Sequence, residues 1–276
     1  MIKRSLGVVP ALVLLLPIMG IGIIRVVLGA LGIWQDDGSS KFSLNGFSAI
    51  TSELAKSIFL TLLIALISTV LALSIGTLTA YSIYRSRRRA ILLKIAVALV
   101  LLTPHLVSAV SINLLLGDSG FLARLLHPII HSWPQFVAGP LWLGVIFDFA
   151  WKESAFVAVM VLAALPNSTT EMVEVARMLR SDSKRVARQV LLPLVKPGLI
   201  LSGGLAFIYA VASYEASWLL GRSYPEPLAV LTYRLFTNSD LVFRSQAYAS
   251  AMVSLLLIAG TSWILVLWLG KLPPRS

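Results

Sequence analysis

The feature that most constrains this chain is a series of long apolar segments with few charges. The first, from Leu6 to Ile24, has nineteen residues without a charged side chain. At 1.5 Å per residue it would form about 28 Å of helix, which matches the hydrocarbon core of a bilayer. Hydrophobic residues make up 58% of the 276 residues and charged residues 13%, unlike soluble domains. These segments predict an all-α integral membrane protein.

Six transmembrane helices are predicted within a single membrane domain that covers residues 1–276. They are Leu6–Ile24, Leu54–Tyr84, Ala90–Leu116, Pro140–Leu165, Gly198–Leu220 and Ala247–Leu269. A cleaved signal peptide is the alternative for the first segment, but its length and the lack of a small-residue cleavage pattern after it favour a retained helix. In the third helix Pro104 is expected to cause a kink, because proline removes a backbone donor.

The distribution of Lys and Arg residues predicts the topology. Fifteen lie on one side of the predicted helices, including the Arg85–Arg89 turn, and seven lie on the other. Because cytoplasmic loops are enriched in basic residues, both termini and the loop 166–197 are predicted to be cytoplasmic, in a multi-pass protein of the cytoplasmic (inner) membrane. The same bias explains the net charge of +11, so no nucleic-acid partner is expected. The chain has no cysteine, which excludes disulfides and cysteine-based metal sites.

The loop between the fourth and fifth predicted helices is charged and amphipathic. Its segment Ser168–Glu171 has the form of a capping box, followed by apolar residues at helical spacing. Ser181 or Ser183 can cap a second short helix, which Pro193 and Pro197 are predicted to end. From the residues alone, these two helices could rest on lipid headgroups or bind a protein.

One spacing in this loop resembles the signature of permease subunits of binding-protein-dependent ABC importers. The family pattern is E-A-A, three residues, G, nine residues, I, two residues, P. Glu174, Ala176 and Pro193 match it, and Val190 replaces the isoleucine conservatively. The main departure is Arg180 at the glycine position, where a side chain makes a turn conformation less accessible. The resemblance covers about residues 54–269.

This resemblance implies a type I ABC importer permease fold in which the loop 166–197, here called the coupling loop, binds a cytoplasmic ATPase dimer. It also implies a second permease subunit, identical or homologous, and an extracytoplasmic solute-binding protein. The residues that the resemblance assigns to ATPase coupling are Glu174, Ala176, Arg177, Arg180, Val190 and Pro193. The chain has no phosphate-binding G-x-x-x-x-G-K-[ST] motif. We therefore expect no enzyme activity and no cofactor in this chain, with ATP and Mg on the partner ATPase.

Ionisable residues inside the predicted helices are candidates for the translocation pathway. They are His105, Asp148, Lys152, Glu153 and Glu215. A charge at membrane depth is costly and usually faces protein or a water-filled cavity. Asp148 and Lys152 are four residues apart and can neutralise each other on one helix face, so a structural role is the alternative. No catalytic or metal-ligating set is expected.

The substrate class is indicated only by similarity within the family. The segments Tyr214–Gly221 and Pro225–Leu235 look more like permeases of the polyamine, thiamine and ferric-iron branch than those of the sugar branch. The expected substrate is a small polar or cationic solute of polyamine, thiamine or metal-ion type. A sugar-type importer permease is the alternative. A secondary transporter is a further one, although the paired broken helices of inverted repeats are not evident.

Overall fold

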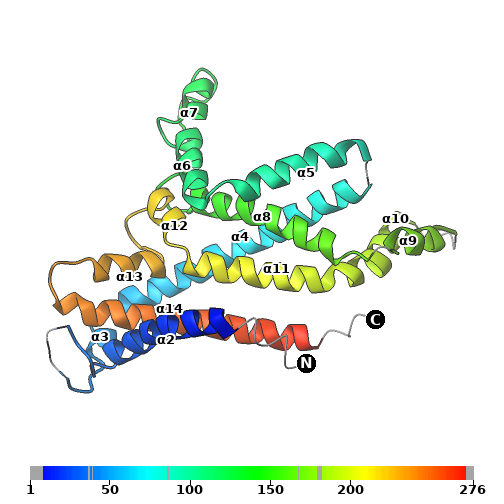
Figure 1. Ribbon diagram of the computed structural model, residues 1–276. Coiled ribbons are helices and arrows are strands. Elements are labelled where there is room, and N and C mark those ends of the chain that lie inside the picture. The colour runs from blue at the N-terminus through cyan, green and yellow to red at the C-terminus, as the bar shows by residue number, and fades with distance from the viewer. Residues whose placement is uncertain are drawn as a thin grey trace. The chain divides into compact units, whose positions relative to one another are not determined.

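The computed structural model (Figure 1) describes residues 9–36, 38, 40–85, 87–166, 168–178 and 182–271. All regular elements in these residues are helices, which confirms the all-α prediction. The chain forms two compact units. The first comprises Met1–Ile58 with Pro227–Leu257, and the second comprises Phe59–Glu226 with Ile258–Ser276.

The first unit is built around a small apolar core. It contains α2 (Val9–Ala30), α3 (Asn45–Ser48), the start of α4 (Thr51–Arg85), α13 (Leu228–Phe236) and the first part of α14 (Val242–Gly270). The short helix α13 was not predicted. Its buried residues Leu228, Leu231 and Leu235 recur at helical spacing, which is the signal that could have found it.

The first transmembrane helix extends further than predicted. α2 continues to Ala30, six residues beyond the predicted end before Arg25. The Arg25 guanidinium forms an ion pair with Asp36, donates to the carbonyl of Trp34 at 2.5 Å, and lies 4.5 Å from the Trp34 ring centroid. Because the charge has these partners, it does not end the helix.

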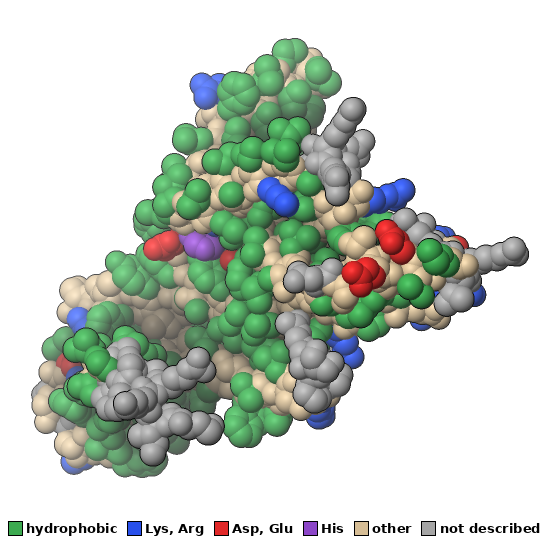
Figure 2. Space-filling view, turned by 45° about the vertical axis from the view of Figure 1, so that its right-hand side comes forward, with side chains coloured by type: hydrophobic (Ala, Val, Ile, Leu, Met, Phe, Trp, Pro, Cys, Tyr) green, Lys and Arg blue, Asp and Glu red, His purple; other side chains and the backbone are tan. Residues whose placement is uncertain are grey.

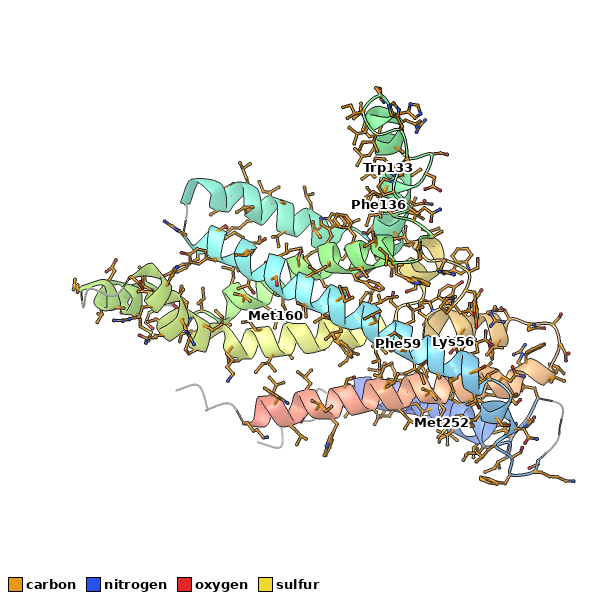
Figure 3. All side chains as sticks on the ribbon, turned by 180° about the vertical axis from the view of Figure 1, so that it is seen from behind. Lys56, Phe59, Trp133, Phe136, Met160 and Met252 are labelled. Carbon is orange, nitrogen blue, oxygen red and sulfur yellow. The ribbon has the colours of Figure 1, made fainter. Side chains whose placement is uncertain are left out.

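The second unit is centred on α8. It contains the rest of α4, α5 (Arg87–Leu102), α6 (His105–Leu116), α7 (Phe121–Leu126), α8 (Leu143–Ala164), α9 (Thr169–Met178), α10 (Ser183–Val186), the π-helical turn η1 (Ala187–Leu191), α11 (Leu192–Ala212), α12 (Glu215–Leu220) and the end of α14. α8 packs against α5, α6, α11 and α12. Beyond α7 the chain folds back along α6, where Trp133 donates to the carbonyl of Leu116 at 2.9 Å and contacts Phe136 edge-on (Figure 3).

Glycines allow two helices to approach α8 closely. A Cβ added to Gly76 of α4 would lie 2.5 Å from the carbonyl oxygen of Ser154, and one added to Gly198 of α11 would lie 2.8 Å from that of Met160. Small residues at such positions let membrane helices pack backbone to backbone. This close packing fixes α4 and α11 on α8.

Five helical segments of the described residues are long and apolar enough to cross a membrane. They are Leu12–Ala30, Thr51–Arg85, His105–Leu126, Lys184–Ala212 and Val242–Gly270. α8 has 22 residues but carries Asp148, Lys152 and Glu153, and it is not one of the five. The predicted helices Leu54–Tyr84 and Ala247–Leu269 are confirmed within α4 and α14. The predicted count of six is not established.

Two other predicted helices are interrupted. The segment Ala90–Leu116 is divided between α5 and α6, which leave Pro104 in different directions (Figure 1). The segment Gly198–Leu220 is divided because Ser213 is extended, so that α11 ends at Ala212 and Glu215 begins α12. The prediction that Glu215 lies on the long transmembrane helix is therefore wrong.

Candidate functional site: coupling loop and buried charges

The first helix of the coupling loop is α9, as the sequence predicts. It begins at Thr169, whose hydroxyl donates to the carbonyl of Pro166 at 2.6 Å. Val173 is 5% exposed and anchors the helix, which packs against α10 and η1. The two halves of the loop therefore form one packed structure.

The opposite face of α9 is exposed and mixed in character. Met172, Val175 and Met178 are exposed hydrophobic residues, and Glu174 between them is also exposed. Figure 2 shows acidic side chains next to hydrophobic ones in this region of the surface. Of the neighbouring apolar residues Met172 and Val173, Val173 is the buried one and Met172 is exposed. Exposed apolar residues beside carboxylates are typical of a protein-binding surface.

The second helix of the coupling loop has a different cap from the one predicted. The Oδ1 atom of Asp182 accepts a hydrogen bond of 2.7 Å from the backbone N–H of Arg185. Asp182, rather than Ser183, thus takes the N-cap role, for which carboxylates are well suited. Ser181 lies outside the described residues.

The prediction that Pro193 and Pro197 end this helix is wrong. α10, η1 and α11 follow one another without a break from Ser183 to Ala212. In the π-helical turn the backbone N–H of Leu192 donates to the carbonyl of Ala187, five residues earlier. The wider π-turn lies directly before the proline, which has no N–H, so the chain passes the proline without ending the helix.

Four of the six predicted coupling residues are fully described. Glu174 and Pro193 are exposed, and Ala176 and Val190 are half-buried. The backbone of Arg177 lies in α9, whereas its side chain and the whole of Arg180 lie outside the described residues. The motif thus begins on α9 and ends on η1 and α11.

Asp148 is the most deeply buried of the predicted pathway residues. Its side chain is 0% exposed. The hydroxyl of Ser108, on α6, donates to its Oδ1 atom, and its Oδ2 atom has no hydrogen-bond partner among the described residues. A buried carboxylate oxygen without a donor is costly unless it serves a ligand or a proton.

The sequence suggested that Asp148 and Lys152 neutralise each other on one helix face, but among the described residues the Lys152 ammonium bonds elsewhere and forms no direct ion pair with Asp148. Its Nζ atom donates to the carbonyl of Val100 at 2.7 Å and also to the carbonyl of Thr103. In a continuous helix the Val100 carbonyl would accept from residue 104, but Pro104 has no N–H. Lys152, which is 4% exposed, therefore caps the C-terminal end of α5, where the proline interrupts the helical hydrogen bonds.

The remaining pathway candidates, His105, Glu153 and Glu215, lie in the same unit as Asp148 and Lys152. The His105 ring contacts that of Tyr209 on α11, with centroids 4.3 Å apart and planes tilted by 32°, and its buried Nδ1 atom has no partner among the described residues. Glu153 is half-buried on α8, and Glu215 is exposed at the start of α12, a helix that packs on α6 and α8. The second unit thus gathers four candidates on α6 and α8 and places the fifth on a neighbouring helix. Sequence reasoning missed Ser108 and Tyr209, whose roles depend on contacts distant in the chain.

Comparisons with known sequences identify the family of the chain. The family described as binding-protein-dependent transport system inner membrane component matches residues 72–272. The ferric transport system permease protein of Actinobacillus pleuropneumoniae is 27% identical over 236 residues, which cover 82% of this chain and 32% of that protein. The molybdenum transport system permease protein of Azotobacter vinelandii is 27% identical over 194 residues, which cover 68% of this chain and 82% of that protein. The chain spans about a third of the length of the ferric relatives.

Solved structures share the fold. A chain of the bacterial alginate ABC transporter, in complex with alginate pentasaccharide-bound periplasmic protein, has a TM-score of 0.75 at 16% identity over 95% of this chain and 91% of its own. A chain of the MetNI methionine ABC transporter has a TM-score of 0.62 at 15% identity, over 82% of this chain and 99% of its own. The structure therefore has the fold of ABC importer permeases.

Proposed function

The chain belongs to the family of inner membrane components of binding-protein-dependent transport systems, and we propose that it is the permease subunit of an ATP-driven importer. The observation that carries this proposal is the family match over residues 72–272, which includes the whole Glu174–Pro193 motif. In this role the chain, as a single permease domain, forms half of the solute pathway with a second permease subunit. A cytoplasmic ATPase dimer binds ATP and Mg and hydrolyses the ATP, so that in this proposal the chain is not itself an enzyme and holds no cofactor.

The coupling loop has features that suit a contact with the ATPase. Its exposed face carries Glu174 between apolar side chains, and its second helix is continuous with α11. A rigid connection of this kind transmits a displacement of the loop directly to α11, which packs on α8. Alternating access requires such a contact, one that differs between two nucleotide states.

The buried charges are proposed to border the pathway. Asp148 Oδ2 on α8 and His105 Nδ1 on α6 are buried atoms without a hydrogen-bond partner in the described part of the chain. Intramembrane ionisable groups usually mark substrate or ion pathways. The relatives named for ferric and molybdenum transport favour a small charged solute that contains a metal. The unpaired carboxylate favours a cation. The molybdenum relative, of which 82% is covered, makes an oxyanion the second candidate.

The test is uptake into proteoliposomes that contain this permease, its ATPase and the solute-binding protein encoded beside them. Ferric ion, molybdate, spermidine, thiamine and maltose would be compared at equal concentration. We expect ATP-dependent uptake of one charged solute only. Uptake without the ATPase would contradict the importer, and uptake of maltose alone would contradict the substrate class.

Both termini are proposed to be cytoplasmic, on the basis of the fifteen-to-seven division of basic residues. Reporter fusions at Gly38 and after Pro274 should report the outer and the cytoplasmic side respectively. Two fusions on the same side would rule out this topology.

A further inference from the structure

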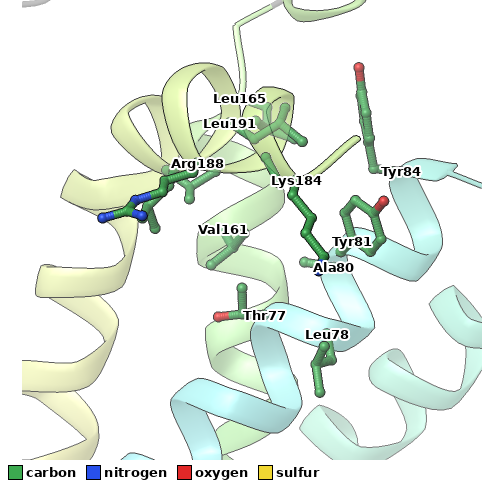
Figure 4. A pocket seen from close by; sticks show the side chains of 13 residues that line it. Thr77, Leu78, Ala80, Tyr81, Tyr84, Val161, Leu165, Lys184, Arg188 and Leu191 are labelled. Atoms are coloured by element: carbon green, nitrogen blue, oxygen red, sulfur yellow. The ribbon is translucent and has the colours of Figure 1, made fainter. Parts of the chain in front are cut away.

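A cavity of about 430 Å³ opens beneath the coupling loop in the second unit (Figure 4). Its walls come from α4, from the end of α8 and from the continuous helix α10–η1–α11. Its volume lies in the range of small-ligand sites, roughly 300–1,000 Å³. Among its apolar lining residues are Leu78, Val161, Leu165, Leu191 and Val195. Such walls exclude a purely hydrophilic occupant.

The polar groups of the cavity are basic or neutral, and none of the described residues that line it is acidic. Lys184 extends towards Ala80 and Tyr81, while the Arg188 guanidinium points to the other side of the opening (Figure 4). Both basic residues are exposed. Two cations at the rim of an apolar cleft match a molecule with an anionic head and a hydrocarbon tail.

We propose that this cavity binds one anionic phospholipid, with an acyl chain between α4 and α11 and the headgroup phosphate at Lys184 and Arg188. The proposal rests on the proposed function for the cytoplasmic position of the loop, where anionic lipids are enriched and basic pockets between helices bind their headgroups. The neutral Tyr81 and Tyr84 rings complete the wall on α4.

A lipid at this position would affect the movement of the coupling loop. One wall of the cavity is η1, which carries the coupling residue Val190, and the opposite wall is α4. A bound lipid stabilises whichever arrangement of these helices has the cavity open. Its occupancy therefore changes how readily the coupling loop moves relative to α4.

The experiment is native mass spectrometry of the purified permease–ATPase complex in detergent. The probe is an equimolar mixture of phosphatidylglycerol and phosphatidylcholine with the same palmitoyl and oleoyl chains. We expect wild-type complex to retain phosphatidylglycerol preferentially. Each of Lys184→Gln and Arg188→Gln should lower that preference about fivefold, the factor that corresponds to about 1 kcal/mol per basic residue. Lys196→Gln is the matched control, because Lys196 is exposed on α11 but does not line the cavity.

A second variant tests the apolar part of the site. Ala187→Phe places a ring in the cavity without changing its charge, and it should lower retention of both lipids. Equal retention of the two lipids by the wild type, or an equal loss in Lys196→Gln, would overturn the proposal. Displacement of the lipid by glycerophosphate would show a site for a free anion. Loss of ATPase from Lys184→Gln, with lipid retention unchanged, would make the ATPase the occupant of this surface. Failure of the wild-type permease to bind an ATPase would instead contradict the proposed function, while lipid retention by the permease alone still reports on the cavity.

Discussion

Replacing Lys152 by methionine tests the capping of the broken helix. Methionine has a similar length but no donor, so the carbonyls of Val100 and Thr103 lose the ammonium that now binds them. Leaving a buried acceptor unsatisfied costs about 1–3 kcal/mol, and two acceptors give about 2–6 kcal/mol. We expect Lys152→Met to lower the free energy of unfolding by this amount, and Lys152→Arg, which keeps a cation with donors, to lower it much less.

The assay is equilibrium unfolding in mixed micelles, followed by tryptophan fluorescence, with uptake measured on the same preparations. Pro104→Ala provides an internal check, because alanine restores an N–H that can donate to the Val100 carbonyl. In that background Lys152→Met should cost less than in the wild type, which a double-mutant cycle measures. If Lys152→Met keeps wild-type stability but abolishes uptake, the capping argument is refuted and Lys152 belongs to the pathway.

Three further predictions concern the loop, the buried carboxylate and helix packing. Glu174→Lys reverses an exposed charge on α9 and should reduce ATPase co-purification at least tenfold, whereas Lys94→Glu on α5 should not; equal co-purification in both would remove Glu174 from the contact. Asp148→Asn keeps an acceptor for Ser108 but removes the charge, so uptake of a cationic solute should fall at least tenfold with assembly unchanged; normal uptake would leave Asp148 a structural residue. Gly76→Ala places a Cβ 2.5 Å from the carbonyl oxygen of Ser154 and should lower the free energy of unfolding by about 1–3 kcal/mol. Gly260→Ala, whose Cβ would meet no described atom within 4 Å, should be neutral or slightly stabilising, and equal stability of the two glycine variants would contradict the close packing of α4 on α8.

Local patterns in the sequence predicted the parts of the fold that depend on local physics. α4 and α14 follow from uninterrupted apolar runs, and α9 follows from a capping box and helical spacing. Asp182 could have been predicted as a cap, because it is as good an N-cap residue as the serines beside it. The continuation of the helix through Pro193 could not, since it depends on a π-turn that a proline rule does not anticipate.

The partners of the buried groups were beyond sequence reasoning because they are distant in the chain. Ser108 reaches Asp148 across forty positions, and Lys152 reaches Val100 across fifty-two. Spacing along a helix suggested instead that Asp148 and Lys152 neutralise each other. The observed partners are distant in sequence because the Val100 carbonyl cannot accept a hydrogen bond from Pro104, which has no N–H. A buried carbonyl without a donor is costly, and Lys152 supplies the donor.

The charges of α8 and the break before α6 depend on each other. An intact helix through residue 104 would satisfy the Val100 carbonyl and leave Lys152 buried without an acceptor there. A helix α8 without Lys152 would leave the broken end of α5 open. Either change alone is unfavourable in a membrane, where unsatisfied backbone groups and unpaired charges are both costly. The break also brings Ser108, at the start of α6, to Asp148. The break at Pro104 therefore accounts both for the acceptors of Lys152 and for the donor to Asp148 Oδ1, while Oδ2 has no partner among the residues that the structure describes. The polar candidates for the pathway on α6 and α8 thus form one connected arrangement.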